Sequence, residues 1–308
     1  MAERGKVAPA VTESADRGKA VTETGPRTVL VLGGGGMKGI AHIGVMKALE
    51  EAAIRPDAVI GTSIGALVGA LIAGGLGWRE LTEIARRLKK EDVVALNRRA
   101  LWLGGIRSTS VFEDRPFVDW MERVLPVRRF SELIMPLRVN AASLVSGEEV
   151  WFGQGCRRDV ELPLALYASC ALPVYFPPLR VDGDVLVDGG ILNAFPLSQA
   201  AAWGAERVIG VDVGSDFAPP AEGYFEQGLV AIHHRVVSLA LRDRRRESLA
   251  RYSHLPGVYI RPEVGHVDTF DFDRTQFLME EGYRAAREAL ETSEWSGKAA
   301  TATPAAEG

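Results

Sequence analysis

Residues 28–65 read TVLVLGGGGMKGIAHIGVMKALEEAAIRPDAVIGTSIG, and this stretch decides the fold. It opens with an apolar run that predicts a buried strand, and apolar residues at helical spacing follow the glycines. A second apolar run, AVIG at residues 58–61, predicts another buried strand, and a second helix is expected to begin near Ile64. Strand, helix, strand and helix in this order indicate a parallel sheet with right-handed crossover connections.

The downstream sequence adds further elements to this sheet. Residues 135–147 and 149–153 predict a hairpin with a Ser-Gly turn, and a second turn is expected at Asp182–Asp184. Further apolar patterns predict strands at 206–214 and 258–263, and helices at 225–251 and 275–291. We therefore expect an α/β fold with a mostly parallel central sheet, helices on both faces, and a helical cap inserted at residues 78–131.

The expected domain covers residues 27–295. Residues 1–26 lack the apolar segment of a signal peptide and are expected to form a disordered tail, as are residues 296–308. Residues 58–77 contain no charged residue, so a membrane-spanning helix is an alternative there. Six glycines in that stretch favour a strand, a turn and a buried helix instead.

Composition narrows the class of protein. The chain has 308 residues and a formal net charge of -4, which argues against a protein that binds nucleic acid along its whole surface. The two cysteines, Cys156 and Cys170, are too few for a disulfide framework and have no zinc-site spacing. We expect a cytoplasmic protein with reduced thiols, no metal and no cofactor.

The glycine-rich loop is the first motif with chemical meaning. Gly34, Gly36 and Gly39 have the G-x-G-x-x-G spacing that can bind a dinucleotide, so a nucleotide-binding protein is one hypothesis. That hypothesis needs an acidic residue at the end of the second strand, whereas Asp57 precedes this strand. The loop can equally hold a transient oxyanion, because consecutive glycine N–H groups form an anion-binding nest, with the charge of Lys38 nearby.

The second motif is G-x-S-x-G, formed by Gly61, Ser63 and Gly65 between the predicted strand and helix. This is the context of a nucleophile elbow, in which a sharp turn exposes a serine hydroxyl at the end of a strand. A plain turn of small residues is the alternative. A nucleophilic serine also needs a base to accept its proton.

Two kinds of base fit the sequence. Asp188 ends an apolar β segment and is followed by Gly189 and Gly190, so partial burial could raise its pKa into a useful range. An α/β-hydrolase triad would run Ser63, Asp188 and then His254 or His266 along the chain. A third interpretation is that Asp188 and Gly189 form a turn with a purely structural role.

Taken together, GGGGMKG, GTSIG, ASCALPVYFPP and DGGILNAFP resemble the patatin-like phospholipases, especially their compact bacterial members. The resemblance covers about residues 28–215. It implies a Ser63–Asp188 dyad without a catalytic histidine, and an oxyanion hole lined by Gly34, Gly35 and Gly36. Two departures stand outside the dyad: residues 141–147, AASLVSG, lack an Asp that is frequent in the family, and Tyr167 stands where Arg is frequent.

The expected function is a lipid acyl hydrolase, that is a phospholipase A, a lysophospholipase or a carboxylester hydrolase. Its substrate would be a lipid or fatty-acyl ester, and peripheral contact with a membrane is an added expectation. Residues 235–251 carry six arginines and could dock on anionic headgroups, although a solvated helix face is the simpler reading. Residues 98–112, with Trp102, Leu103, Ile106 and Phe112, could form a lid. Acyl-chain length, headgroup and oligomeric state do not follow from the sequence.

Overall fold

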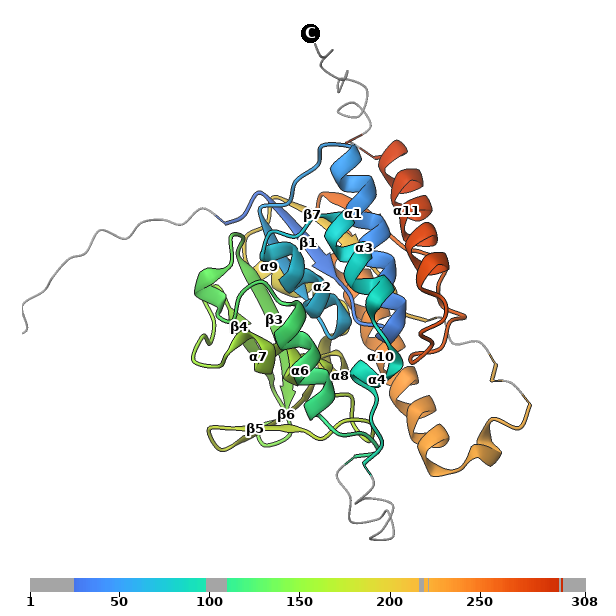
Figure 1. Ribbon diagram of the computed structural model, residues 1–308. Helices are drawn as coiled ribbons and strands as arrows, with labels where there is room; N and C mark the ends of the chain where they lie inside the picture. The colour runs from blue at the N-terminus through green and yellow to red at the C-terminus, as the bar shows by residue number, and fades with distance from the viewer. Residues whose placement is uncertain (1–24, 98–109, 216–218, 221, 294, 296–308) are drawn as a thin grey trace, which may run out of the picture.

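The computed structural model describes residues 25–97, 110–215, 219–220, 222–293 and 295 (Figure 1). Within them, one sheet has eight strands in the order β5–β6–β3–β2–β1–β7–β8, and β4 pairs with β3 outside this order. Neighbouring strands are parallel from β3 to β8, namely β3 (Leu137–Ser143), β2 (Ala58–Gly61), β1 (Thr28–Leu32), β7 (Arg207–Val211) and β8 (Gly257–Ile260). The antiparallel strands are β4 (Glu149–Gly153), β5 (Leu179–Val181) and β6 (Asp184–Asp188).

Helices lie in the segments where the apolar patterns predict them, and α7 and α8 are additional helices that the patterns do not predict. The longer ones are α1 (Ala41–Glu51), α2 (Ile64–Ala73), α3 (Trp78–Arg87), α6 (Arg115–Val124), α7 (Leu162–Cys170), α10 (Leu229–Tyr252) and α11 (Thr275–Glu291). The shorter ones are η1 (Gly36–Ile40), α4 (Lys90–Val93), η2 (Phe130–Glu132), α8 (Gly190–Asn193), α9 (Leu197–Ala202) and η3 (Phe225–Gln227).

Two hydrophobic cores lie on the two faces of the sheet. Successive side chains of a strand point to opposite faces, so Leu30 and Leu32 of β1 join one core and Val29 and Val31 join the other. The larger core contains buried side chains of α1, α2, α3, α6, α7 and α11. The smaller one contains Phe195 and residues of α9, with the last turns of α10 packed against it. Helices therefore cover both faces, and the expected α/β fold is confirmed.

The predicted hairpin and the predicted turn at Asp182–Asp184 are both present. β3 and β4 pair with Ala142 opposite Glu149, and β5 and β6 pair around Asp182 and Gly183, which both have positive φ. The predicted strand from residue 135 is shorter than expected and ends at Ser143, because the Ser143 hydroxyl accepts hydrogen bonds from the N–H groups of Val145 and Ser146 and forms a turn.

Residues 58–77 do not form one long helix. They divide into β2, a turn at Thr62–Ser63, and α2, which ends at Ala73. Among the residues described, no helix combines the length and the apolar character needed to cross a bilayer.

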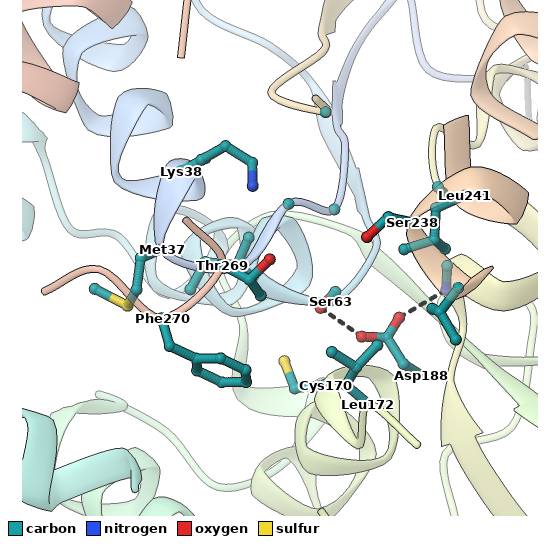
Figure 2. Close-up of a pocket in the computed structure, with 18 of the residues that line it drawn as sticks. Met37, Lys38, Ser63, Cys170, Leu172, Asp188, Ser238, Leu241, Thr269 and Phe270 are labelled. Carbon is teal, nitrogen blue, oxygen red and sulfur yellow. Dashed lines mark hydrogen bonds between the residues drawn. The ribbon is translucent and has the colours of Figure 1, made fainter. Parts of the chain in front are cut away.

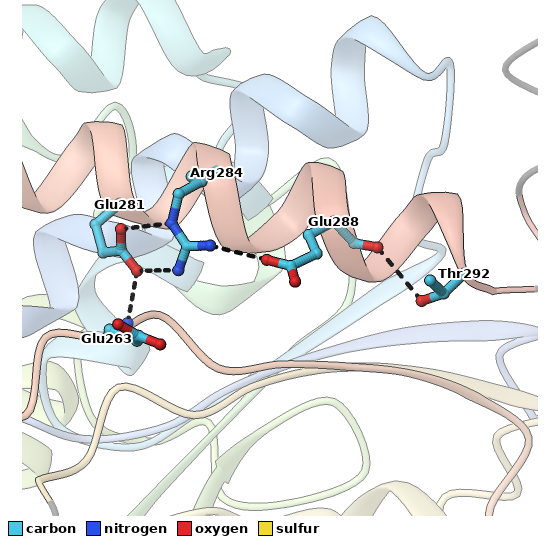
Figure 3. A network of polar contacts seen from close by, with 5 residues as sticks. All are labelled: Glu263, Glu281, Arg284, Glu288 and Thr292. Atoms are coloured by element: carbon cyan, nitrogen blue, oxygen red, sulfur yellow. Dashed lines mark hydrogen bonds and ion pairs between the residues drawn. The ribbon is translucent and has the colours of Figure 1, made fainter.

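The last helix, α11, is held by α1 and by the segment that follows β8. α11 packs along α1 so closely that a Cβ on Gly44 would lie 1.9 Å from the Met279 carbonyl oxygen. Its outer surface carries the polar network of Figure 3, in which Arg284 contacts Glu281 and Glu288 at 2.7–2.9 Å. Glu281 also accepts a hydrogen bond from the N–H of Glu263, which ties the segment after β8 to the helix.

The predicted domain limits stay predictions for the tails, since residues 1–24 and 296–308 lie outside the described part of the chain. Gly25 and Pro26 are half-buried, and Gly25 lies against Gly204. Of the expected cap, α3 packs on α1, while α4 packs on α6 and α6 on α7.

Candidate active site

Ser63 sits on a sharp turn between β2 and α2. Its backbone has φ 55° and ψ -127°, a conformation that a residue with a Cβ adopts at a cost of about 1–3 kcal/mol. The surrounding chain holds it there: the N–H of Ser63 donates to the Ser169 hydroxyl at 2.9 Å, and the N–H of Gly65 donates to the Thr62 carbonyl. A Cβ on Gly65 would lie 2.3 Å from the Leu32 carbonyl oxygen, so only glycine fits beside β1.

The Ser63 hydroxyl donates to Asp188 Oδ2 at 2.7 Å (Figure 2). The other carboxylate oxygen, Oδ1, accepts a hydrogen bond from the N–H of Gly190, also at 2.7 Å. The structure thus brings together the serine of G-x-S-x-G and the aspartate of D-G-G, which are 125 positions apart in the chain.

The pairing of β3 explains why these two residues meet. β4 pairs with Arg138–Ala142 along one edge of β3. β2 pairs with Leu137–Val139 of β3, and β6 pairs with Ala141–Ser143. Each of these two segments shares residues with the segment that pairs with β4, and two strands cannot pair with the same residues along the same edge. β2 and β6 therefore both lie on the edge of β3 opposite β4. They run in opposite directions along it, and their ends, Gly61 and Asp188, meet tip to tip.

Asn140, between those two pairing sites, links the two strand ends. It is fully buried, and its Oδ1 accepts a hydrogen bond from the Thr62 hydroxyl at 2.9 Å. Its Nδ2 donates to the carbonyls of Gly189 at 3.3 Å and Asn193 at 3.2 Å. A Cβ on Gly189 would lie 2.5 Å from the Asn140 side chain, which explains why glycine follows Asp188.

The environment of Asp188 suits a base. Its carboxylate is buried, and burial raises its pKa from 3.8 to about 6, although the hydrogen bonds from Ser63 and Gly190 stabilise the charged form and limit the rise. A carboxylate with this pKa is mostly ionised at neutral pH and still more basic than an exposed aspartate.

Only some of the backbone N–H groups of the glycine loop donate hydrogen bonds to other parts of the described chain. The N–H of Gly33 donates to Val211 O at 3.0 Å, and that of Gly34 donates to Ala194 O at 2.9 Å. Within the described chain, no protein group accepts from the N–H of Gly35 or Gly36, nor from that of Ile64 at the start of α2. Gly34 lies against Ser63, so these N–H groups belong to the surroundings of the serine.

Two buried cationic or titratable side chains support the loop. His42 is fully buried and burial lowers its pKa to about 4, so the ring is neutral and Nε2–H donates to Gly33 O at 3.0 Å. Lys38 is also buried and its Nζ donates to Val267 O at 3.3 Å. Burial lowers the pKa of Lys38 to about 8, partly offset by Asp268, so it carries a positive charge at neutral pH.

Ser63 and Asp188 open onto a cavity of about 150 Å³ that is lined mainly by apolar side chains. They come from several elements, and Val93 of α4 with Phe117 and Trp120 of α6 supplies one wall. Figure 2 shows Cys170 and Leu172 beside Ser63 and Asp188, and Phe270 farther along the cavity, toward Met37. Burial raises the pKa of Cys170 well above its ordinary value, so its thiol stays neutral.

The predicted histidines lie elsewhere. His254 stacks on Tyr252 and His266 packs against Phe277; both are exposed, and neither lines the cavity. His234 of α10 does line it, but its ring contacts the Tyr224 hydroxyl at 3.0 Å and the Thr269 hydroxyl at 3.3 Å. Neither oxygen of Asp188 has a histidine partner in the described residues.

The structure also describes Ser143, Tyr167 and part of the expected lid. Ser143, in the segment that lacks the frequent Asp, donates to Asp184 at 2.6 Å and accepts the two N–H groups of the hairpin turn. Tyr167 is buried, and its hydroxyl donates to Pro177 O at 2.6 Å, so it fixes α7 to the next loop. Of the expected lid, Phe112 packs on Phe270 and other rings, whereas Trp102, Leu103 and Ile106 lie outside the described residues.

Sequence reasoning missed Asn140 and Ser169, which position the two strand ends and the serine. A signal for each is present, because both are polar residues inside apolar segments, VNAAS and LYASCAL. A buried polar residue needs a hydrogen-bond partner, and the partner here comes from a distant segment.

Comparisons with known proteins identify the family of this chain. A family model described as patatin-like phospholipase matches residues 30–201. An uncharacterised NTE family protein of Mycobacterium tuberculosis is 33% identical over 196 residues, which cover 64% of this chain and 51% of that protein. Patatin-like phospholipase domain-containing protein 7 of Rattus norvegicus is 30% identical over 283 residues, which cover 85% of this chain and 20% of the relative.

This chain thus spans about half, or less, of the length of these relatives. Among solved structures, VipD from Legionella pneumophila has a TM-score of 0.47 at 16% identity, over 87% of this chain and 67% of the other. The family match covers more than half of the chain and contains both segments that meet at β3. On this evidence the chain belongs to the patatin-like phospholipase family.

Proposed function

We propose that this protein is a serine lipid acyl hydrolase in which Ser63 is the nucleophile and Asp188 the base. The observation that carries the proposal is the 2.7 Å hydrogen bond between a strained serine and a buried carboxylate at the wall of an apolar cavity. The pKa of Asp188, raised to about 6, fits a base that works near neutral pH.

The first half of the reaction forms an acyl-enzyme. Asp188 Oδ2 accepts the proton of Ser63 as Oγ bonds to the carbonyl carbon, and the carbonyl electron pair moves to the oxygen. The N–H groups of Gly35 and Gly36 would hold this oxyanion, Gly34 would shape the loop, and Lys38 adds positive charge. The electron pair then returns, the bond to the alcohol breaks, and Asp188 gives its proton to the leaving oxygen.

The second half repeats these steps with water. Asp188 accepts a proton from a water molecule as the water oxygen attacks the acyl carbon, and the same N–H groups hold the second oxyanion. When the bond to Ser63 breaks, the proton returns to Oγ and a fatty acid leaves. No step uses a metal or a cofactor.

The cavity supports an acyl chain as the bound part of the substrate. Its lining is mainly apolar, which suits a hydrocarbon, and burial of apolar surface is the main source of affinity for such a group. We propose esters of fatty acids as substrates, with a phospholipid, a lysophospholipid and a neutral ester as the three classes to compare.

A fluorophosphonate probe tests the nucleophile. Wild type should be labelled, Ser63→Ala should not, and Ser146→Ala, which changes an exposed serine, should be labelled like wild type. Labelling of Ser63→Ala would disprove the assignment. A screen of ester substrates on wild type and Ser63→Ala would then rank the three classes.

The dyad and a histidine triad predict opposite results. With a dyad, Asp188→Asn should lose about 10³-fold or more in kcat, while His234→Ala, His254→Ala and His266→Ala should stay within about threefold of wild type. With a triad, one histidine variant should lose most of the activity and Asp188→Asn should lose less. Hydrolysis of a soluble short-chain ester gives both measurements.

A further inference from the structure

The first half of α10 exposes an apolar stripe to the outside. Leu229, Ile232, Val236 and Leu239 are 81%, 44%, 60% and 38% exposed, and their spacing of three and four residues places them on one face of the helix. Phe225 in η3, just before the helix, is also exposed. This outward stripe, residues 229, 232, 236 and 239, contributes nothing to either core of the described chain.

In the second half of α10, the same outward face carries charged residues. Continued by helical spacing, the stripe reaches Asp243 and Glu247, which are exposed and charged. The outward face therefore changes from apolar to charged within one continuous helix. Exposed single apolar residues are common, but a contiguous stripe of four indicates a surface that meets an apolar partner.

The opposite face of the stripe's own segment borders the active site. Val237, Ser238 and Leu241 line the cavity that holds Ser63 and Asp188. Val230 and Ala231 line a neighbouring cleft of about 860 Å³, between α10 and residues 268–273. The cleft and the catalytic cavity are adjacent, because both are lined by Leu88, His234, Thr269, Phe270 and Phe272.

Charge points to the kind of partner. α10 holds six arginines against Asp243 and Glu247, an excess of basic residues. Arg242, Arg244 and Arg251 form ion pairs with these two carboxylates, and Arg245 is buried against Asp212. Helical spacing places Arg235 and Arg246 on one flank of the stripe, and His233, Arg244 and Arg251 on the other, while Arg242 lines the catalytic cavity. Lys89 and Lys90 line the cleft, and so do Asp268, Asp271 and Asp273.

We propose that the outward stripe of α10, together with Phe225, docks into the surface of an anionic lipid bilayer. The apolar half of the helix enters the interface, the arginines of the following turns contact anionic headgroups, and the cleft opens at the bilayer surface. The proposal rests on the proposed function, because it assigns a membrane lipid as the substrate that reaches the cavity past α10.

Binding of the full chain to vesicles tests the docking face. Wild type should co-sediment with phosphatidylcholine–phosphatidylglycerol vesicles and bind pure phosphatidylcholine vesicles more weakly. The double variant Ile232→Asp/Val236→Asp should bind the mixed vesicles at least roughly 30-fold more weakly, because each change removes an inserted apolar side chain and adds a negative charge. Neither position lines the cavity or the cleft.

The matched control is Ala250→Asp, which adds the same charge to the exposed face of the same helix beyond the stripe. It should bind vesicles within about threefold of wild type, and all three proteins should hydrolyse a soluble short-chain ester equally. Val236→Trp, a second variant that keeps the stripe apolar, should bind vesicles more tightly than wild type.

Several results would overturn the proposal. They are no vesicle binding by wild type, equal binding by the double variant, an equal loss in Ala250→Asp, or a wild-type dimer that the double variant dissociates while vesicle binding is unchanged. Ser63→Ala should bind vesicles like wild type and hydrolyse no ester. If wild type binds vesicles yet hydrolyses no ester, the proposed function fails and the docking face stands.

Discussion

Replacing Asp188 by asparagine should make the protein more stable while it removes activity. Asparagine has nearly the same shape, its Nδ2 can donate to the Ser63 oxygen, and its Oδ1 can accept the N–H of Gly190. The change therefore removes the buried charge and keeps both contacts. The buried charge lowers the stability of the folded wild-type protein, and the raised pKa of Asp188 measures how much stability is lost.

The cost follows from the rise of the pKa from 3.8 to about 6. A raised carboxyl pKa means that the native state binds the proton more tightly than the unfolded state, so stability falls as pH rises from about 4 to about 6 and is constant above. A difference of about two pKa units corresponds to about 3 kcal/mol. Asp188→Asn should thus be about 3 kcal/mol more stable than wild type at about pH 8, and less than about 1 kcal/mol more stable at about pH 4.

Urea denaturation of both proteins at the two pH values measures this difference, with Asp184→Asn as a control for a carboxylate that is less buried. A gain of the same size at both pH values would mean that the carboxylate charge is not its cause. A loss of stability at about pH 8 would refute the reasoning, since it would show that the carboxylate is better accommodated than the amide.

Other predictions concern the rate and the positioning residues. Below about pH 6, kcat/KM on a soluble ester should fall about tenfold per pH unit as Asp188 is protonated; a flat profile down to pH 5 would contradict its role as base. Above about pH 8 the rate should fall again as Lys38 loses its charge, and Lys38→Met should lack this alkaline limb. Asn140→Ala should lower kcat about 10- to 100-fold with little change in KM, and an unchanged kcat would remove Asn140 from the positioning of the dyad. The free energy of unfolding of Ser63→Gly should exceed that of Ser63→Ala by at least about 1 kcal/mol, because glycine tolerates the positive φ at this position. Equal free energies of unfolding would mean that the turn is not strained.

The local parts of the site could be predicted because each depends on a few neighbouring residues. The turn at Ser63 needs Gly61 and Gly65 within the same five residues, and Asp188 ends an apolar run that any β-strand pattern reveals. The alternation of Val29 and Val31 with Leu30 and Leu32 likewise indicates a strand buried on both faces.

The contacts between distant segments could not be predicted in the same way. Nothing near Asn140 in the sequence says that β2 and β6 pair with the same edge of β3, so its role between Thr62 and Gly189 appears only in the fold. The same holds for Gly34, whose N–H serves Ala194 O rather than standing free. On α10, the arginines were visible in the sequence, but the exposed apolar stripe depends on which face the body of the protein covers.

The shared edge of β3 has a consequence for how this site can diversify. Because β2 and β6 end at neighbouring positions along β3, a shift of β3 should move the turn that holds Ser63 and the strand end that holds Asp188 together. Part of the cavity wall comes from α4, α6 and α10, which are not strands of this sheet. We therefore expect substitutions at Val93, Trp120 or Leu241 to alter which substrates the cavity accepts while the contact between Ser63 and Asp188 is kept.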